Sequence, residues 1–326
     1  MMSSIKNKIL VTGGAGNVGS ALVEKLIRDP GNFVVIVDNL STGFLSKLPP
    51  LTFTNWKFIK ADVNFAADIS SVMLSYNFDY VFHFAAVVGV LRTQENPVDV
   101  LYDIEGIKNI LNLSKNSSVK HVYFASSSEV YGEPVELPQN EHSTPLNSRV
   151  PYAVVKNVGE CFFRSYWQTY QLPYTIFRFF NTYGPNQSTD FVVPKFLSSA
   201  LKNKDITIYG DGSQTRTFTF VDDTVSVCSK IFKEHLLMND VINIGNDVLL
   251  SVKELAEIAI RLTGSSSKII YLPPLKEGDM TRRQPDNVRM LKILNKKLVN
   301  IEEGIQLMLN DPRFIKSIEA SNHVRH

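Results

Sequence analysis

The stretch LVTGGAGNVGS, residues 10–20, decides the fold that the sequence predicts. Its glycines follow directly on the apolar run KILVT. Glycines at this spacing permit a tight turn, a close approach of the backbone to a pyrophosphate, and close packing of a helix on a sheet. The N–H groups at the start of the following helix can bind the phosphates. We therefore expect a dinucleotide cofactor here, with an ordinary strand–helix turn as the alternative. The residues expected to contact the cofactor are Gly13, Gly16, Asn17, Val18 and Gly19.

An acidic residue, Asp38, closes the next apolar run, FVVIVD at 33–38. An acid at this point accepts hydrogen bonds from both ribose hydroxyls of NAD and repels the 2′-phosphate of NADP. No arginine follows directly, because the next residues are NLSTG. The sequence therefore favours NAD, with a plain turn role for Asp38 as the alternative. The further residues expected at the cofactor are Asn39, Asp62 and Val63, the last two flanking the adenine, and Ala85 and Ala86, which pass beneath the cofactor.

Short β-like runs alternate with longer helical patterns through the first half of the chain. The expected strands lie at 8–12, 33–37, 56–60, 80–84, 121–125 and 174–179, and the expected helices near 17–28, 66–76, 98–115 and 152–170. This alternation predicts an α/β fold, a parallel sheet with helices on both faces. Proline- and glycine-rich loops then break the rhythm, and helical patterns return near 191–202, 222–235, 251–263 and 302–310. The polar tail after Pro312 is expected to fray.

Composition narrows the classes of protein to be considered. The chain of 326 residues is 44% hydrophobic and 20% charged, with a formal net charge of +2. This balance gives no electrostatic reason to expect a nucleic-acid or membrane partner. Two cysteines, Cys161 and Cys228, and the lack of a signal-peptide pattern favour a reduced, cytoplasmic setting. The six histidines are scattered, so no metal site is expected.

A tyrosine and a lysine lie four residues apart in PYAVVK, at Tyr152 and Lys156. On a helix this spacing puts both side chains on one face. A tyrosine is a poor base at neutral pH, but a nearby ammonium and a positively charged nicotinamide ring would lower its pKa. Ser127, at the end of an earlier apolar run, would hydrogen-bond the substrate hydroxyl or the tyrosine. These residues predict a catalytic site, with a surface pair at positions i and i+4 as the alternative.

The motifs TGGAGNVG, HFAA, SSSEVYG, YAVVK, RFFNTYGP and YGDGSQTRTFTFVDD together resemble the extended short-chain dehydrogenase/reductase family. More narrowly, they resemble its NAD-dependent nucleotide-sugar epimerases, dehydratases and decarboxylases, over roughly residues 7–310. The resemblance implies a Rossmann-like, doubly wound parallel sheet that holds NAD tightly, and a smaller C-terminal α/β lobe for a nucleoside diphosphate sugar. We place the first lobe at 1–180, with a returning segment at about 215–245, and the second at 181–214 and 246–326.

The resemblance also implies residue roles. Ser127 falls on the contact to the oxidised hydroxyl, Tyr152 on the base and Lys156 on its partner. Phosphate contacts fall on Asn181, on Arg216, and on either Arg282 or Arg283, since guanidinium binds phosphate oxygens in a bidentate fashion. Val193 and Pro194 would line the base pocket. Tyr209 would line that pocket too or belong to the core.

Glu129 bears on the type of reaction. Once C4 of the sugar is a ketone, a carboxylate near C5 can remove the C5 proton or steer loss of a C5 carboxylate. Dehydratases and decarboxylases of the resembled family carry a glutamate at this position, and simple 4-epimerases usually lack it. The preceding residue is Ser128, a substrate contact, where deoxyhexose dehydratases typically have aspartate. The Ser-Glu pair does not choose between dehydration and decarboxylation, and a non-catalytic polar role for Glu129 is the alternative.

The leading hypothesis is therefore an enzyme that works through a 4-keto sugar, with chemistry at C5 or C6. A 4-epimerase, a non-catalytic NAD-binding sensor and a dehydrogenase using exchangeable NAD are the alternatives. A homodimer is also expected, because family members pair the helices near 98–115 and 152–170 across a two-fold axis. The apolar residues assigned to that surface are Leu101, Ile104, Ile107, Ile110, Leu111, Val155, Val158, Phe162, Phe163 and Tyr166.

Overall fold

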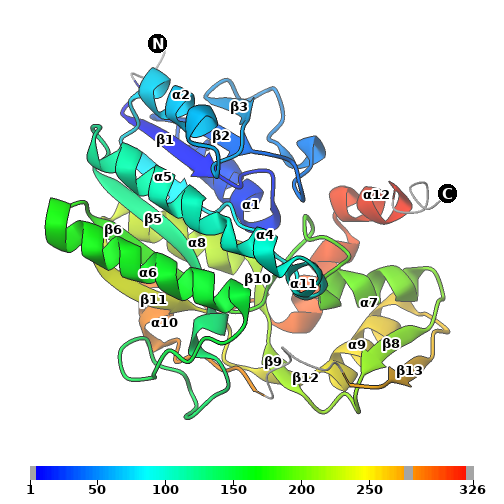
Figure 1. Cartoon of the computed structure of the whole chain (residues 1–326). Coiled ribbons are helices and arrows are strands. Elements are labelled where there is room, and N and C mark those ends of the chain that lie inside the picture. The colour runs from blue at the N-terminus through cyan, green and yellow to red at the C-terminus, as the bar shows by residue number, and fades with distance from the viewer. Residues whose placement is uncertain (1–4, 275–281, 321–326) are drawn as a thin grey trace.

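The computed structural model describes residues 5–274 and 282–320. Its centre is a seven-stranded parallel sheet in the order β11-β6-β5-β4-β1-β2-β3 (Figure 1). The strands are β1 (Asn7–Thr12), β2 (Asn32–Asp38), β3 (Trp56–Lys60), β4 (Tyr80–His83), β5 (His121–Ser127), β6 (Tyr174–Phe179) and β11 (Asp240–Ile244). The predicted α/β fold is confirmed.

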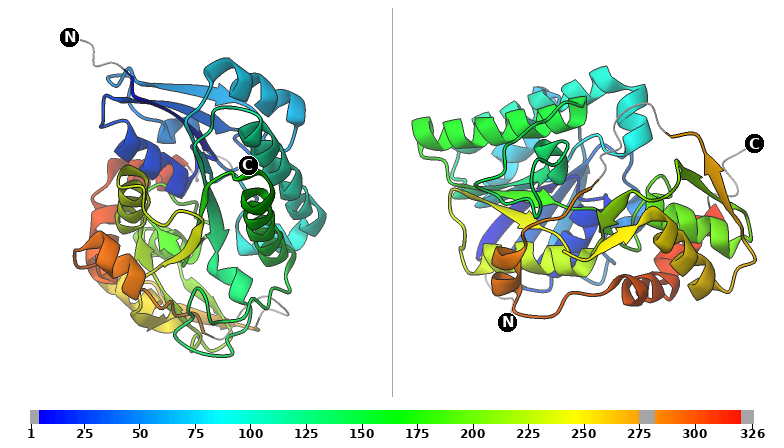
Figure 2. Two further views of the ribbon diagram at one scale, coloured as in Figure 1. Left: turned by 90° about the vertical axis from the view of Figure 1, so that its left-hand side faces the viewer. Right: turned by 90° about the horizontal axis from the view of Figure 1, so that it is seen from below.

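Two helical layers cover the sheet, as Figure 2 shows from the side. One layer contains α2 (Ala66–Tyr76), α4 (Pro97–Leu101), α5 (Asp103–Lys115) and α6 (Pro151–Tyr170), and the other α1 (Asn17–Leu26), α8 (Val221–Lys233) and α10 (Val288–Leu294). Successive strand side chains point to opposite faces. In β1, Leu10 packs toward the first layer, whereas Ile9 and Val11 pack toward the second. Burial on both faces explains why the strands read as continuous apolar runs.

A second lobe has its own core. It contains α7 (Val192–Leu201), α9 (Val252–Thr263), α11 (Ile301–Leu309) and α12 (Pro312–Ala320). Short strands pair in twos: β8 (Ile206–Tyr209) with β13 (Ile269–Leu272), β9 (Thr215–Thr217) with β12 (Leu249–Ser251), and β7 (Thr182–Tyr183) with β10 (Thr219–Phe220). The division of the chain into the two predicted lobes stays a prediction.

Three expectations about helices are corrected. The tail after Pro312 does not fray at once, because α12 buries Phe314 and Ile318 in the second core. The helix expected at 98–115 is interrupted at Tyr102, between α4 and α5. Half of the residues assigned to a dimer surface belong to the core instead, because their side chains face the sheet: Ile107, Ile110, Leu111, Val155 and Phe163.

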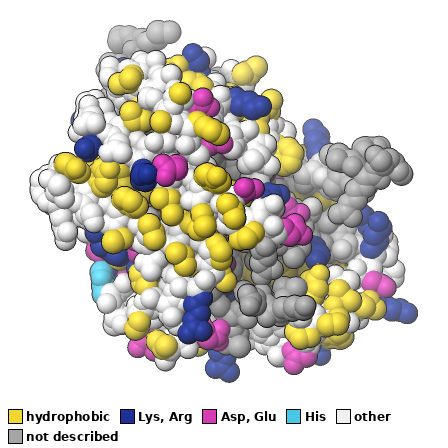
Figure 3. All heavy atoms as spheres, viewed as in Figure 1, with side chains coloured by type: hydrophobic (Ala, Val, Ile, Leu, Met, Phe, Trp, Pro, Cys, Tyr) yellow, Lys and Arg dark blue, Asp and Glu magenta, His cyan; other side chains and the backbone are white. Residues whose placement is uncertain are grey.

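Some apolar side chains of this layer do reach the surface. Leu101 is 45% exposed and Tyr102 is 60% exposed, and Ile104, Val158, Phe162 and Tyr166 are partly exposed. Figure 3 shows hydrophobic side chains spread across the face on which α5 and α6 run in Figure 1.

Candidate active site

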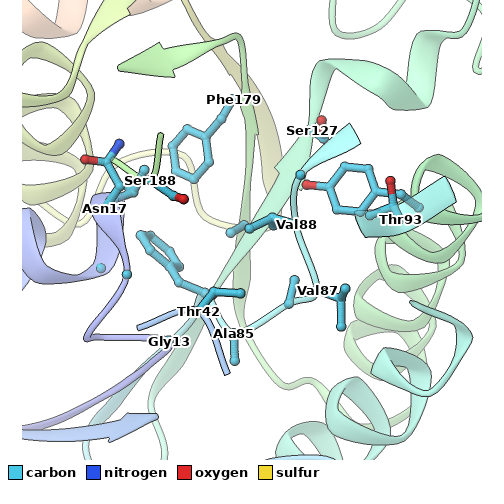
Figure 4. A pocket seen from close by; sticks show the side chains of 18 of the residues that line it. Gly13, Asn17, Thr42, Ala85, Val87, Val88, Thr93, Ser127, Phe179 and Ser188 are labelled. Carbon is cyan, nitrogen blue, oxygen red and sulfur yellow. The ribbon is translucent and has the colours of Figure 1, made fainter. Parts of the chain in front are cut away.

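A cavity of about 900 Å³ lies at the carboxyl ends of the strands, between the sheet and the second lobe. The chain leaves β1 for β2 and β3 on one side, and β4 lies on the other side of β1. Such a reversal of strand order opens a crevice in which α/β proteins bind ligands. Figure 4 shows Gly13 and Asn17 toward one side of the cavity and Ser127 and Thr93 toward the other, with Val88 between them.

The glycine turn forms one wall of the cavity. Gly13 has φ +69°, and a Cβ there would lie 2.7 Å from the backbone nitrogen of Ala85. A Cβ on Gly19 would lie 2.2 Å from the carbonyl oxygen of Gly13. The turn thus closes tightly against the start of α1 and leaves backbone facing the cavity, which fits a pyrophosphate. The residues predicted at the cofactor all line this cavity: Gly13, Gly16, Asn17, Val18, Gly19, Asp38, Asn39, Asp62, Val63, Ala85 and Ala86.

Asp38 lies where the ribose of a bound dinucleotide is expected. Its Oδ2 accepts a hydrogen bond from the Ala15 N–H at 3.0 Å, and its Oδ1 accepts one from the Leu40 N–H at 2.8 Å. Lys47 lines the same part of the cavity. Burial lowers the pKa of its amine to about 8, although the negative charge of Asp38 opposes that change. Sequence reasoning missed Lys47, because it belongs to no motif and ends a 3-10 helix, η1 (Leu45–Lys47), too short to leave a periodic pattern.

Ser127, Tyr152 and Lys156 meet at the opposite end. Ser127 ends β5, and its side chain accepts the Glu129 N–H at 3.2 Å and lies near enough to Tyr152 to lower the pKa of the phenol. Tyr152 and Lys156 lie on the first turns of α6, and the Lys156 Nζ is 5.7 Å from the centre of the Tyr152 ring. The structure therefore brings the three predicted residues together in one cavity.

The pKa of Tyr152 differs from expectation. Burial raises it above its usual value, the Glu129 carboxylate raises it further, and the hydrogen bond from Ser127 opposes both. The sequence predicted a lowering by Lys156 and by a positively charged cofactor ring. Burial lowers the pKa of Lys156 itself to about 8, while the charge of Asp103 opposes that change. In the protein alone, desolvation is the largest influence on the pKa of Tyr152.

Asp103 is a second residue that the sequence did not reveal. It begins α5, is buried and lines the cavity. Its Oδ2 accepts the Val87 N–H at 2.7 Å, and its Oδ1 accepts the side-chain amide of Asn64 at 3.4 Å. Burial raises the pKa of this carboxyl, and the charge of Lys156 opposes the rise. An acidic residue at the start of a helix is usually explained by its favourable interaction with the helix dipole. Nothing in the sequence therefore placed Asp103 in the cavity.

Glu129 faces an arginine from the far end of the chain. It lies in the short helix η2 (Ser128–Tyr131), and its Oε1 is 3.3 Å from a terminal nitrogen of Arg283. The Glu129 side chain is 20% exposed and the Arg283 side chain 8% exposed. Both line the cavity, as does Ser128, whereas Arg282 is exposed and does not line it. Of the two arginines that the sequence offered as a phosphate contact, Arg283 is the one that lines the cavity, and its contact with a phosphate stays a prediction.

The remaining predicted substrate contacts divide into two groups. Asn181 and Val193 line the cavity, and the side-chain amide of Asn181 donates to the Thr217 carbonyl at 3.0 Å. Arg216 and Tyr209 are not among the described residues that line it. Arg216 is buried on β9, with its guanidinium donating to the Thr215 carbonyl at 2.8 Å. Tyr209 ends β8, and the Lys195 Nζ lies 5.7 Å from the centre of its ring.

Residues 5–274 and 282–320, which the structure describes, show neither a metal-binding group of side chains nor a membrane-spanning helix. These residues contain no group of three or more His, Cys, Asp or Glu arranged to hold a metal ion. None of the helices they form is long and apolar enough to span a membrane.

Comparison with known proteins connects this site to a family. Residues 9–245 match the family described as the NAD dependent epimerase/dehydratase family. The chain is 35% identical over 311 residues to a putative UDP-glucose 4-epimerase of Methanocaldococcus jannaschii, covering 93% of this chain and 97% of that one. It is also 35% identical over 299 residues to a UDP-N-acetyl-alpha-D-glucosaminuronate decarboxylase of Bacillus cytotoxicus, covering 88% and 91%.

A solved structure agrees with the sequence relatives. The UDP-glucose 4-epimerase of Thermotoga maritima, crystallised with UDP-glucose, matches with a TM-score of 0.86 and 30% identity, covering 95% of this chain and 98% of that one. The resemblance read from the motifs and the Rossmann-like fold that it implied are both confirmed. The chain is an enzyme that belongs to the NAD dependent epimerase/dehydratase family.

Proposed function

We propose that this enzyme modifies a nucleoside diphosphate sugar through a 4-keto intermediate, with dehydratase or decarboxylase chemistry at C5 or C6. One observation carries the proposal: Glu129 lies in the cavity with the Ser127–Tyr152 pair and is paired with Arg283. A carboxylate held at this place serves a reaction that continues after C4 has been oxidised. A reaction that only inverts C4 has no use for it.

The geometry supports the following roles for the chain's own residues. Ser127 and Tyr152 lie close together in the cavity and can share the C4 hydroxyl, so that Tyr152 takes its proton. Lys156 supplies positive charge beside the tyrosine ring. The residues of the glycine wall would hold NAD tightly, and NAD would supply the hydride-transfer chemistry at C4 and be regenerated within the same turnover. Glu129 then removes the C5 proton or steers the loss of a carboxylate, while Arg283 fixes its position.

The nucleotide end of the substrate is assigned to the side of the cavity formed by Asn181 and Val193. Uridine is the first base to test, because the relatives and the structural neighbour are all named for UDP-sugars. Glu129 and Arg283 are 154 residues apart in the chain but lie side by side in the cavity, so the sugar would contact both.

A 4-epimerase is the second candidate function. It is favoured by the names of two similar proteins, the relative from Methanocaldococcus jannaschii and the structural neighbour from Thermotoga maritima. A non-catalytic NAD sensor is less well supported, because a sensor has no need of Ser127, Tyr152 and Lys156 in contact with one cavity. A dehydrogenase that uses exchangeable NAD would lose the cofactor during purification, whereas the proposed enzyme would retain it.

The test is incubation of the purified enzyme with UDP-glucose, UDP-glucuronate, UDP-N-acetylglucosamine and their dTDP, GDP and CDP counterparts, followed by mass spectrometry. Loss of one water identifies a dehydratase, and loss of carbon dioxide a decarboxylase. An unchanged mass with altered chromatography identifies an epimerase and refutes the C5/C6 chemistry. The Tyr152→Phe variant is the matched control, since it retains the ring and lacks the proton acceptor.

A further inference from the structure

A buried ion pair lies beneath the catalytic residues. Arg178 on β6 and Glu160 on α6 are 1% and 0% exposed. The Arg178 Nε donates to Glu160 Oε1 at 2.8 Å, and a terminal nitrogen donates to Oε2 at 2.7 Å. This is the two-point geometry that fixes a guanidinium and a carboxylate in one plane.

The pair is attached to both ends of the segment that carries Ser127 and Glu129. On one side, the Ser126 hydroxyl donates to Glu160 Oε1 at 2.7 Å. On the other side, the second terminal nitrogen of Arg178 donates to the Tyr131 hydroxyl at 2.8 Å. Ser126 immediately precedes Ser127, and Tyr131 ends η2, the helix that contains Glu129.

The same pair is attached to the helix that carries the base. Tyr152, Lys156 and Glu160 follow one another at intervals of four along α6, so they share a helix face. Glu160 is therefore one turn beyond Lys156, on the face that points to the sheet. A third contact anchors the network to the sheet edge, because the Tyr131 hydroxyl donates to Asn243 Oδ1 on β11 at 2.7 Å.

We infer that Glu160, Arg178, Tyr131 and Ser126 form a positioning network. This network fixes the positions of Ser127 and Glu129 relative to Tyr152 and Lys156. The inference rests on the catalytic roles proposed above for those four residues. Of the four network residues, Ser126 lines the cavity, whereas Glu160, Arg178 and Tyr131 do not. These three therefore act through their neighbours.

Stability alone is a poor reason for such a network. Burying two charges costs several kcal/mol per ion before their attraction offsets it, and apolar pairs of similar volume are often as stable. The ion pair instead fixes orientation, because each of its hydrogen bonds holds a side chain next to the segment or helix that carries the catalytic residues. Reacting groups must be held closely, and a shift of about 1 Å can cost roughly a hundredfold in rate.

The experiment compares two isosteric variants with a matched control. Tyr131→Phe removes one hydroxyl between Arg178 and Asn243, and Ser126→Ala removes one between β5 and Glu160. The control is Thr175→Val on the same strand as Arg178. It removes a buried hydroxyl that contacts the His121 Nε2 at 2.8 Å, at the opposite end of the sheet from the cavity.

The first readout is amide hydrogen exchange of the NAD-bound protein. Tyr131→Phe should speed exchange in the peptide covering 128–132 by about tenfold or more, and Ser126→Ala should do so in 151–160 as well. Thr175→Val should leave both peptides unchanged. Because the two network variants break different contacts, misfolding of one leaves the other to decide.

The second readout is turnover of whichever UDP-sugar the wild type converts. Both network variants should lower kcat by about tenfold to a hundredfold while KM stays within roughly threefold, since substrate contacts are intact. Exchange and kcat equal to those of Thr175→Val at matched Tm would overturn the inference. If the wild type converts none of the UDP-, dTDP-, GDP- and CDP-sugars of the panel above, the proposed function fails, whereas the exchange measurement still decides the positioning role.

Discussion

Replacing Glu129 with glutamine separates the two halves of the proposed reaction. The amide has nearly the shape of the carboxylate, and its oxygen can still accept from Arg283, which lies 3.3 Å from Glu129 Oε1. It cannot take a proton at neutral pH. Ser127, Tyr152 and Lys156 are untouched, so oxidation of the sugar should proceed and the following step should stall.

The substitution should have a small effect on stability and a large effect on the reaction rate. One-fifth of the Glu129 side chain is exposed and the cavity is open to solvent, so loss of its charge should cost about 1 kcal/mol of stability. For a chain of 326 residues that is a fall in Tm of roughly 1–2 °C. Loss of a general base should lower the rate by about 10²–10⁴. A rate loss of that size therefore cannot come from stability.

The assay mixes the NAD-bound variant with the UDP-sugar that the wild type converts, and follows absorbance of the reduced cofactor and product mass together. We expect the reduced cofactor to accumulate with little product. If Glu129 only steers loss of a carboxylate, no solvent deuterium enters C5 before that loss. Glu136→Gln is the control, because Glu136 contacts Thr144 outside the cavity. Turnover of Glu129→Gln near the wild-type rate would refute the C5/C6 chemistry and leave the 4-epimerase.

Four further predictions concern the cofactor, the base, a buried acid and assembly. Asp38→Ala should weaken NAD binding by about ten- to a hundredfold, because hydrogen bonds to a charged group contribute about 1.5–3 kcal/mol; an unchanged preference for NAD over NADP in a titration would remove Asp38 from the ribose site. Tyr152→Phe should bind NAD yet lose about 10²–10⁴ in rate, and half the wild-type activity would show that another residue takes the proton. Asp103→Asn should raise the Tm of the NAD-free protein, because burial raises the pKa of Asp103 and its charge opposes folding once the pH exceeds that raised value. Thermal melts should show the gain at pH 8 and its loss as the pH falls toward the usual pKa of aspartate; a gain independent of pH would contradict the argument. Finally, sedimentation should show a homodimer that Leu101→Arg converts to monomer, since Leu101 is 45% exposed at the start of the expected interface; a wild-type monomer at micromolar concentration would contradict the pairing.

The strands and long helices were predictable because their periodicity survives in a single sequence. Runs such as FVVIV are buried on both faces and leave a continuous apolar signal. The short strands of the second lobe have two to four residues, too few for any periodicity to show. The helix α12 was missed because its composition is polar, although Phe314 and Ile318 lie four apart on one buried face.

Some features of the site could likewise be predicted from the sequence and others could not. The glycine turn, Asp38 and the Tyr152–Lys156 pair were predictable, because each depends on neighbours within a few residues. Contacts such as Glu129 with Arg283 join distant parts of the chain, and no local pattern distinguishes Arg283 from Arg282. The pKa direction of Tyr152 could not be predicted either, because it depends on how far the folded chain excludes water.

The position of β11 at the edge of the sheet has a consequence for folding during synthesis. Strands β1 to β6 are complete when Phe179 leaves the ribosome, but β11 follows only after α7, β8 and α8 have been made. Until then β6 presents an open edge, on which another chain can pair. Asn243 lies on β11, so the Tyr131 hydroxyl lacks this acceptor in a nascent chain that ends before that strand. A nascent chain arrested before Asp240 should therefore be prone to aggregate, and release of the finished chain should coincide with the appearance of a competent site.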